Sequence, residues 1–396
     1  MTSGLETPVS AGKRAIPAAG AEQSAVHPSR TALLIPGLAM LACLLWGAYQ
    51  ASVALMRPAE EPAIPRGRQA LLDGRMTRTF EKRFNSSLPA RAQLIAAANS
   101  IRYMVTRGAP DGVRVGRDGW LFLSEELEYH QSSGSNLRRR VELAARVNDA
   151  LRARNIALVV AVVPDKARVY ERYLPGGRQP VSAASRYDDF VRAAWAKGLT
   201  VPDLATALKE ASRKQDVYYR TDTHWNQAGA RVVATELASA VAALNLGLPQ
   251  SSFRTVPRGG EESGPNDLLR LMGLSDVTDS FRPRGDREIP VETVKSDAAT
   301  DAGADDLFGD SGTPVALVGS SYSQRANFHG SLQEALRADV LNAAQDDAQF
   351  MKALQRYLSN AAFKEAPPQL IVWELPERYL TAPLLDEGAW IDGVLQ

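Results

Sequence analysis

The sequence predicts an α/β domain built on a mostly parallel sheet with helices on both sides, preceded by one membrane-spanning helix. Three observations predict this architecture. The continuous apolar runs 157–163 and 315–319 have the composition of strands buried on both faces of a parallel sheet. Stretches with apolar positions three and four residues apart, such as 137–155 and 227–244, alternate with these runs. The uncharged stretch 31–56 is long and apolar enough to cross a bilayer as a helix.

The composition excludes several classes of protein. The 396 residues are 45% hydrophobic and 23% charged, which is the range of globular chains. The chain has 46 basic and 45 acidic residues. A nucleic-acid-binding protein usually has an excess of basic residues, so we expect no nucleic acid as a partner. The only cysteine is Cys43, so neither an internal disulfide nor a Cys-ligated zinc site can form. Four histidines are too few to favour a multi-histidine metal centre, and we expect no metal and no cofactor.

The N-terminal region divides into a tail, an anchor and a linker. Residues 1–30 are rich in Ala, Pro, Ser and Gly and are predicted to be a disordered tail. We interpret 31–56 as a transmembrane anchor. Basic residues flank it on both sides, so the positive-inside rule does not fix its orientation. Small residues at 52–54 leave a cleavable signal peptide as the alternative, but the long leader favours an uncleaved anchor.

The remaining chain is interpreted as a linker with N-terminal helices over 57–110 and one main domain over 111–396. The main domain is predicted to begin with two short strands about an Asp-Gly turn within 113–123. The elements expected next are a helix over 137–155, a strand over 157–163, a helix over about 185–197, a short strand over 201–204 and a helix over 227–244, with Asn226 as its N-cap.

The stretch 250–312 breaks this alternation. It is rich in Pro, Gly and Asp and includes the acidic low-complexity stretch 297–311, so we interpret it as an insertion or cap. Strands are predicted again at 315–319 and 369–374, with helical stretches between them. Ligands bind at the carboxyl ends of such strands, where the sequence places Asp165, Ser321 and Glu374.

Two segments carry residues suited to nucleophilic catalysis. In Asp222-Thr223-His224, the carboxylate can accept a hydrogen bond from one imidazole nitrogen and leave the other nitrogen to act as a base. In Gly319-Ser320-Ser321, a serine follows a buried strand on a sharp turn, where backbone N–H groups can bind an oxyanion. Each pattern alone is more often a helix cap or a hydrogen-bonded loop, so the prediction rests on their joint occurrence.

Five segments together resemble the AlgX/AlgJ family of SGNH-hydrolase-like proteins, which act in bacterial exopolysaccharide O-acetylation. They occur in the family's order and span about 110–380. The anchor, and a chain end soon after the last segment, look more like the AlgJ branch than AlgX. The segments are Val-Gly-Arg-Asp-Gly-Trp-Leu-Phe-Leu (115–123), Val-Val-Pro-Asp-Lys (162–166), Thr-Asp-Thr-His-Trp-Asn (221–226), Gly-Ser-Ser-Tyr-Ser (319–323) and Trp-Glu-Leu-Pro-Glu-Arg-Tyr-Leu (373–380).

The resemblance implies roles for individual residues. Ser321 would be the nucleophile, His224 its base and Asp222 the partner that orients the base. Ser320 stands where the family commonly has Thr, so a second serine adjoins the nucleophile; His329 is the competing base. The residues expected to line the substrate groove are Tyr322, Arg325, Arg378 and Tyr379; their structural alternatives are a packed tyrosine and an ion pair between Arg378 and Glu374. Lys166 and Arg168 are interpreted either as ligands of an anionic sugar or as surface residues.

The function implied by the resemblance is O-acetyl transfer to an alginate-like exopolysaccharide, by an inner-membrane-anchored protein with a periplasmic catalytic domain. The implied partners are the polysaccharide acceptor, a membrane-bound O-acyltransferase as acetyl donor, and other exopolysaccharide-secretion proteins. Two alternatives remain open. An acetylesterase would use the same residues and pass the acetyl group to water, and a non-catalytic scaffold would only bind the polysaccharide or partner proteins.

Overall fold

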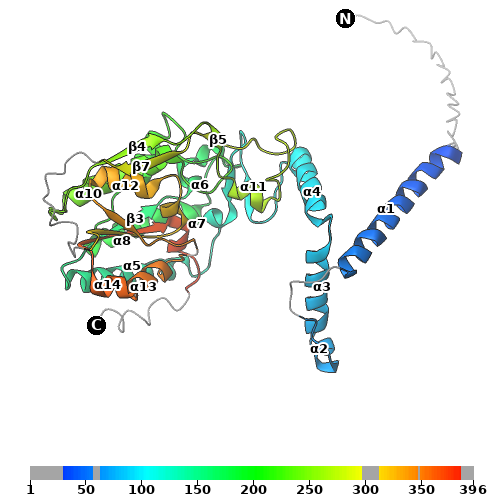
Figure 1. Cartoon of the computed structure of the whole chain (residues 1–396), viewed down its shortest axis with the longest axis horizontal. Helices are drawn as coiled ribbons and strands as arrows, with labels where there is room; N and C mark the ends of the chain where they lie inside the picture. Colours follow the sequence, from blue (N-terminus) through cyan, green and yellow to red (C-terminus); the bar gives the residue numbers. More distant parts are fainter. Residues whose placement is uncertain (1–29, 57–62, 297–311, 347, 385–396) are drawn as a thin grey trace, which may run out of the picture. The chain divides into compact units, whose positions relative to one another are not determined.

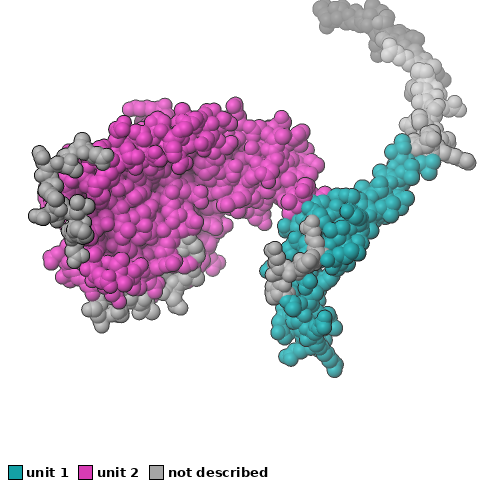
Figure 2. All heavy atoms as spheres, viewed as in Figure 1, with its two compact units in different colours: residues 1–91 teal, residues 92–396 magenta. Residues whose placement is uncertain are grey.

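The computed structural model describes residues 30–56, 63–296, 312–346 and 348–384. The chain forms two compact units, which are coloured separately in Figure 2. Unit 1 covers 1–91 and unit 2 covers 92–396. The predicted disordered tail (1–30) lies almost entirely outside the described residues. The helix that precedes the first hairpin, α4 (Arg91–Thr106), belongs to unit 2 apart from its first residue.

Unit 1 contains the apolar helix α1 (Arg30–Met56), followed by α2 (Arg68–Leu72) and α3 (Arg75–Ser87). Over Leu34–Met56, α1 has a mean hydropathy of 1.6 and is long enough to cross a membrane. Its large apolar side chains are exposed, which suits a helix that lies in a membrane. A signal sequence near the N-terminus has the same properties.

The centre of unit 2 is a four-stranded, fully parallel sheet in the order β3-β10-β8-β9. Its strands are β3 (Ala157–Val163), β8 (Val315–Val318), β9 (Val340–Asn342) and β10 (Leu370–Pro376). In β10, Trp373 lies opposite Val160 of β3 and Val318 of β8. Because β8 ends at this level, the next residue of β10, Glu374, lies beside the turn that follows β8. The parallel sheet predicted from the apolar runs is therefore confirmed.

Helices cover both faces of the sheet (Figure 1). Alternate residues of each strand face opposite layers, so every position of the central strands is buried. Each buried branched side chain stabilises the fold by about 1.5–3 kcal/mol. One layer contains α5 (Ser133–Arg152), α8 (Arg186–Ala196), α13 (Lys352–Leu358) and α14 (Ala361–Glu365); the other contains α9 (Leu204–Ala211), α10 (Gln227–Ala242) and α12 (Phe328–Leu336).

The predicted hairpin is present as β1 (Val113–Val115) paired antiparallel with β2 (Leu121–Leu123). Asp118 and Gly119 both have positive φ angles, 54° and 80°. Two successive left-handed residues match the twist of a tight hairpin, which explains the Asp-Gly pair. The hairpin leads into the short helical segment η1 (Ser124–Leu127) and, after α5 and β3, into α6 (Lys166–Val169), η2 (Glu171–Tyr173) and α7 (Val181–Ala184).

The strand predicted over 201–204 is wrong in extent. Only Thr200 pairs with the sheet, through a single parallel bridge to Val159 of β3. Pro202 has no N–H to continue the ladder, and the side chain of Asp203 caps α9 by accepting from the N–H of Thr206. The chain therefore changes from strand to helix within three residues.

The segment 250–296 of the predicted insertion is ordered outside the central sheet. It contains β4 (Phe253–Pro257) paired with β7 (Val291–Lys295), β5 (Glu262–Ser263) paired with β6 (Arg287–Glu288), and α11 (Asp267–Leu271). The acidic stretch 297–311 lies outside the described residues. A small apolar cluster anchors α11 to α4 and to the hairpin; its buried members are Tyr103, Ala109, Val113, Leu121, Leu268, Leu269, Met272 and Leu274.

Candidate active site

A short loop carries the acid–histidine pair at one edge of the sheet. Tyr218 and Trp225 form an antiparallel bridge that closes the loop, and the N–H of Tyr219 donates to the carbonyl of His224. Asn226 ends the loop, because its side chain accepts from the N–H of Gly229 and caps α10 as predicted. The loop is thus closed at its base, which holds Asp222 and His224 in a fixed conformation.

Asp222, His224 and Ser321 form one hydrogen-bonded chain. Nδ1 of His224 lies 2.6 Å from Oδ1 of Asp222, and Nε2 lies 2.7 Å from Oγ of Ser321. Asp222 and His224 are buried, whereas Ser321 is half-buried. The arrangement suits proton transfer, because the carboxylate fixes the orientation of the ring and the second ring nitrogen can accept the serine proton.

The environment of Asp222 keeps this carboxylate ionised. Burial opposes ionisation, but hydrogen bonds from the His224 side chain and from backbone N–H groups more than compensate and hold its pKa below the ordinary value. Oδ1 accepts from the N–H of His224 at 3.0 Å, and Oδ2 accepts from the N–H of Asp267 at 2.8 Å. An ionised Asp222 can stabilise a positive charge on the imidazole ring.

The two neighbouring serines of the 319–323 segment have different hydrogen-bond partners in the structure. Ser321 opens the helical turn η4 (Ser321–Gln324) and faces His224. The hydroxyl of Ser320 is buried and donates to Glu374, whose carboxylate also accepts from the N–H of Ser320 and the hydroxyl of Ser323. Glu374 thus holds the turn in place. The alternative pair between Glu374 and Arg378 is not among the ion pairs of the described residues.

Gly319 allows this close packing between the β8 turn and β10. A Cβ atom at this position would lie 2.5 Å from Oε2 of Glu374 and 2.7 Å from Oγ of Ser323. Both are far shorter than ordinary carbon contacts, so only glycine leaves room for the carboxylate.

Tyr322, which was expected to line the groove, is fully buried. Its ring centroid lies 4.7 Å from that of His224, and its hydroxyl donates to the carbonyl of Thr223 at 3.0 Å. Trp225 packs edge-on against the same ring. We therefore assign Tyr322 to support of the imidazole and the loop, since it has no exposed surface with which to touch a sugar.

The other expected groove residues lie nearby in different environments. Arg325 and Tyr379 are half-buried. Arg378 belongs to the helical turn η5 (Glu377–Leu380) after β10, and its guanidinium lies 5.8 Å from the Tyr322 ring centroid and 5.2 Å from that of Tyr379. Nε of Arg325, and Nε and Nη1 of Arg378, are buried without a hydrogen bond to the described part of the chain.

Neither Lys166 nor Arg168 lies on the surface. Nζ of Lys166 is fully buried and donates to three carbonyl oxygens of the histidine loop, including that of Asp222 at 2.7 Å. Arg168 forms a two-pronged ion pair with Glu377. Both interpretations from the sequence are therefore corrected: these cations find buried partners, so they neither lie on the surface nor are available to bind a sugar.

The competing base is engaged elsewhere. Nε2 of His329 lies 2.7 Å from the carbonyl oxygen of Val340, to which it donates. It therefore has no role beside Ser321.

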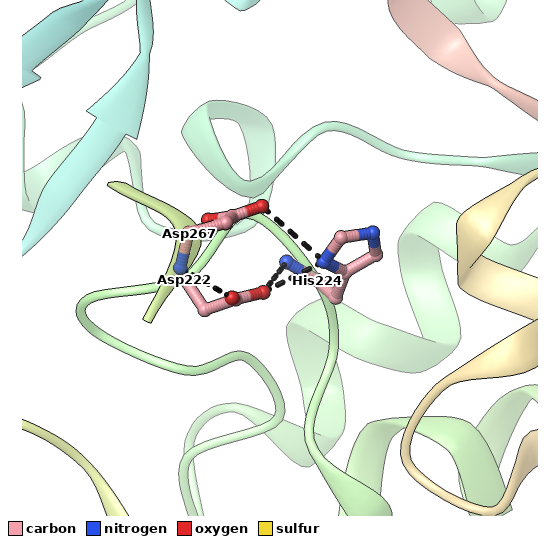
Figure 3. Close-up of side chains that lie close together, drawn as sticks. All are labelled: Asp222, His224 and Asp267. Carbon is pink, nitrogen blue, oxygen red and sulfur yellow. Dashed lines mark hydrogen bonds and ion pairs between the residues drawn. The ribbon is translucent and has the colours of Figure 1, made fainter. Parts of the chain in front are cut away.

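One residue beside the histidine was not predicted. Asp267, from α11, accepts from the N–H and hydroxyl of Thr223, and its second carboxylate oxygen lies 3.6 Å from Nδ1 of His224 (Figure 3). Nothing in the local sequence pairs it with a loop 45 residues earlier. Asp222, His224 and Asp267 also offer ligand atoms within 4.8 Å of one another, the spacing of a possible cation site. An ion there would displace the hydrogen bonds that Asp222 already makes.

A serine, a histidine and an aspartate joined by hydrogen bonds at the carboxyl edge of a parallel sheet are the arrangement of serine hydrolases and serine acyltransferases. Residues 113–377 match the family described as "SGNH hydrolase-like domain, acetyltransferase AlgX". The chain belongs to this AlgX/AlgJ family, and it is an acyltransferase by that membership.

Individual relatives agree with this assignment. The chain is 37% identical over 321 residues to the probable alginate O-acetylase AlgJ of Pseudomonas aeruginosa. The aligned region covers 78% of this chain and 81% of that protein. It is 28% identical over 275 residues to the alginate biosynthesis protein AlgX of Pseudomonas putida, covering 66% of this chain and 55% of that one. The solved O-acetyltransferase domain of Pseudomonas putida AlgJ matches with a TM-score of 0.63 and 34% identity, covering 72% of this chain and 99% of that domain.

Proposed function

We propose that this protein transfers acetyl groups to hydroxyls of an alginate-like exopolysaccharide, with Ser321 as nucleophile, His224 as general base and Asp222 as the partner that orients and stabilises the imidazole. The observation that carries the proposal is the hydrogen-bonded chain from Asp222 through His224 to Ser321. The relatives named as probable alginate O-acetylases supply the substrate class.

In the first half-reaction, Oγ of Ser321 attacks the carbonyl carbon of an acetyl donor while its proton passes to Nε2 of His224. The donor's leaving group departs with that proton and leaves an acetyl ester on Ser321. In the second, a sugar hydroxyl gives its proton to Nε2 and attacks the acetyl carbon; the serine oxygen leaves and regains the proton. The N–H of Ser321, at the start of η4, would donate to the oxyanion.

The apolar helix α1 supports a location at the membrane. We place the catalytic body outside the inner membrane, with α1 as its anchor. Activated acetyl groups are made in the cytoplasm, so a membrane-bound O-acyltransferase is the partner that would deliver them, within a larger set of exopolysaccharide-secretion proteins.

Trapping the acetyl-enzyme tests the proposal. Purified full-length protein is mixed with 4-nitrophenyl acetate, quenched in acid and digested, and the peptide that contains Ser321 is examined by mass spectrometry. We expect one added acetyl group on Ser321, which disappears when alginate oligosaccharide is added. Acetylated sugar as the product supports a transferase, free acetate alone supports the esterase alternative, and no adduct together with no turnover supports the scaffold.

A further inference from the structure

The segment 250–296 holds the catalytic loop through three acidic side chains. Asp286 accepts from the N–H groups of Arg220 and Thr221, each at 2.9 Å, and from the hydroxyl of Thr221. Glu288 accepts from the hydroxyl of Tyr219. Asp267 accepts from the N–H of Thr223 at 2.7 Å. The acidic side chains thus bind four positions of the loop that carries His224, namely 219, 220, 221 and 223.

Asp267 differs from the other two because it reaches the catalytic pair itself. Its N–H donates to Oδ2 of Asp222 at 2.8 Å, and its Oδ2 lies 3.6 Å from Nδ1 of His224. Nδ1 already has a closer acceptor in Asp222 at 2.6 Å. An ionised Asp267 would therefore act on the ring as a second negative charge rather than as a second hydrogen-bond acceptor. Its side chain is 17% exposed, so solvent screens this charge only weakly.

Placing the Asp267 carboxylate beside that of Asp222 costs electrostatic free energy, and a residue that only anchored α11 would not need this position. Burial and the charge of Asp222 both raise the pKa of Asp267. Two carboxylates beside one neutral imidazole repel each other, whereas an imidazolium between them would attract both. Three other charged groups contact the loop: the ammonium of Lys166 donates to the carbonyl of Asp222, and Asp286 and Glu288 accept from the Thr221 and Tyr219 hydroxyls. Across the ring, Ser321 and the Tyr322 side chain are uncharged, and the Arg378 guanidinium lies 5.8 Å from the Tyr322 ring centroid.

We propose that Asp267 is a positioning residue of the active site, which stabilises the His224 imidazolium as the serine or sugar proton is transferred, so that segment 250–296 completes the catalytic machinery. This inference rests on the proposed role of His224. Without the Asp267 charge, the ring would accept a proton less readily, and both half-reactions would slow.

Asp267→Asn tests the inference, because the amide keeps the backbone contact with Asp222 and the acceptor for Thr223 but loses the charge. The matched control is Asp276→Asn, an exposed acid of the same segment. Full-length variants in detergent are assayed in EDTA with 4-nitrophenyl acetate and alginate oligosaccharide from pH 5 to 9. We expect kcat of Asp267→Asn to fall about 10- to 100-fold with little change in KM. Its acidic limb should move to lower pH, since the ring holds its proton less firmly; the control should match wild type.

Wild-type kcat in Asp267→Asn overturns the inference, and so does a lower kcat with a lower Tm and an unmoved acidic limb, which indicates an anchoring role alone. If Asp267→Asn does not fold, the pair Asp267→Glu and Asp267→Gln makes the same comparison at equal side-chain length, and only the Glu variant should keep the acidic limb of the wild type. Full activity of Ser321→Ala would instead refute the proposed function and leave the contact of Asp267 with the ring unexplained.

Discussion

The hydroxyl oxygen of Ser321 lies 2.7 Å from Nε2 of His224, although 97 positions separate the two residues in the chain. The parallel sheet brings them together, because β8 delivers Ser321 at its carboxyl end and the loop before α10 is closed at the same edge. On the opposite side of the ring, Nδ1 is engaged by Asp222. The imidazole is therefore oriented before any substrate binds.

Replacing each neighbouring serine should distinguish their roles. Ser321→Ala is expected to lower acetyl transfer at least about 10³-fold with little change in Tm, because the nucleophile is lost and only Nε2 of His224 loses a hydrogen-bond partner. Ser320→Ala removes a hydroxyl from buried Glu374 and should destabilise the fold by about 1–3 kcal/mol while activity remains measurable. Steady-state kinetics and thermal melts measure both; an active Ser321→Ala with an inactive Ser320→Ala would reverse the assignment.

Asp222→Asn should lower kcat by about 10⁴-fold, because an amide cannot stabilise the imidazolium and favours the wrong ring tautomer. The side chain keeps its size, so we expect the variant to fold. Kinetics with 4-nitrophenyl acetate and a circular dichroism melt make the comparison. Activity within tenfold of wild type would show that Asp222 is not the partner of the base.

The elements and site residues that could be predicted from the sequence are those marked by short, continuous sequence patterns. The apolar runs predicted β3, β8 and β10, and the two polar segments predicted Asp222, His224 and Ser321, because each motif lies within a few residues. Asp267 could not be found in this way, since its link to Thr223 exists only after segment 250–296 has folded against the hairpin. Lys166 and Arg168 were misjudged for a related reason: a charged side chain is buried only when distant groups supply partners, and sequence does not display those partners.

Lys166→Met should destabilise the protein and lower its activity together. The buried ammonium donates to carbonyl oxygens of Tyr219, Arg220 and Asp222. The carbonyl of Arg220 would keep the N–H of Leu121, but those of Tyr219 and Asp222 would lose their donor. We expect a loss of about 2–4 kcal/mol in urea unfolding, and a lower kcat even where the variant is fully folded. Lys209→Met, at an exposed position of α9, is the control and should leave both unchanged. Wild-type stability of Lys166→Met would show that water replaces the ammonium.

Glu126→Gln should make stability less sensitive to pH. Burial and the charge of Asp165 raise the pKa of Glu126 from 4.5 to about 8, so the folded protein retains a proton that the unfolded chain loses. The wild type should therefore lose stability as pH rises from about 4.5 to 8. The amide still accepts from the N–H of Ala167 and carries no charge. Urea titrations should show equal stability at pH 5 and a variant that is about 1–3 kcal/mol more stable at pH 9. Glu128→Gln, an exposed neighbour, should follow the wild type; parallel curves for all three proteins would contradict the prediction.

Gly319→Ala should impair catalysis through packing alone. The new methyl group would lie 2.5 Å from Oε2 and 2.7 Å from Cβ of Glu374, and β10 cannot yield because both its neighbours pair with it. The turn must move instead, and it carries Ser321 away from His224.

Overpacking of this kind costs about 1–3 kcal/mol of stability, and a displacement near 1 Å at a reacting atom costs about 100-fold in rate. We therefore expect kcat to fall far more than Tm. Gly112→Ala, where a Cβ meets nothing within 4 Å, is the matched control. If Gly319→Ala kept both rate and Tm, the turn would be able to shift without separating the serine from its base, and the close contact with Glu374 would not be what positions Ser321.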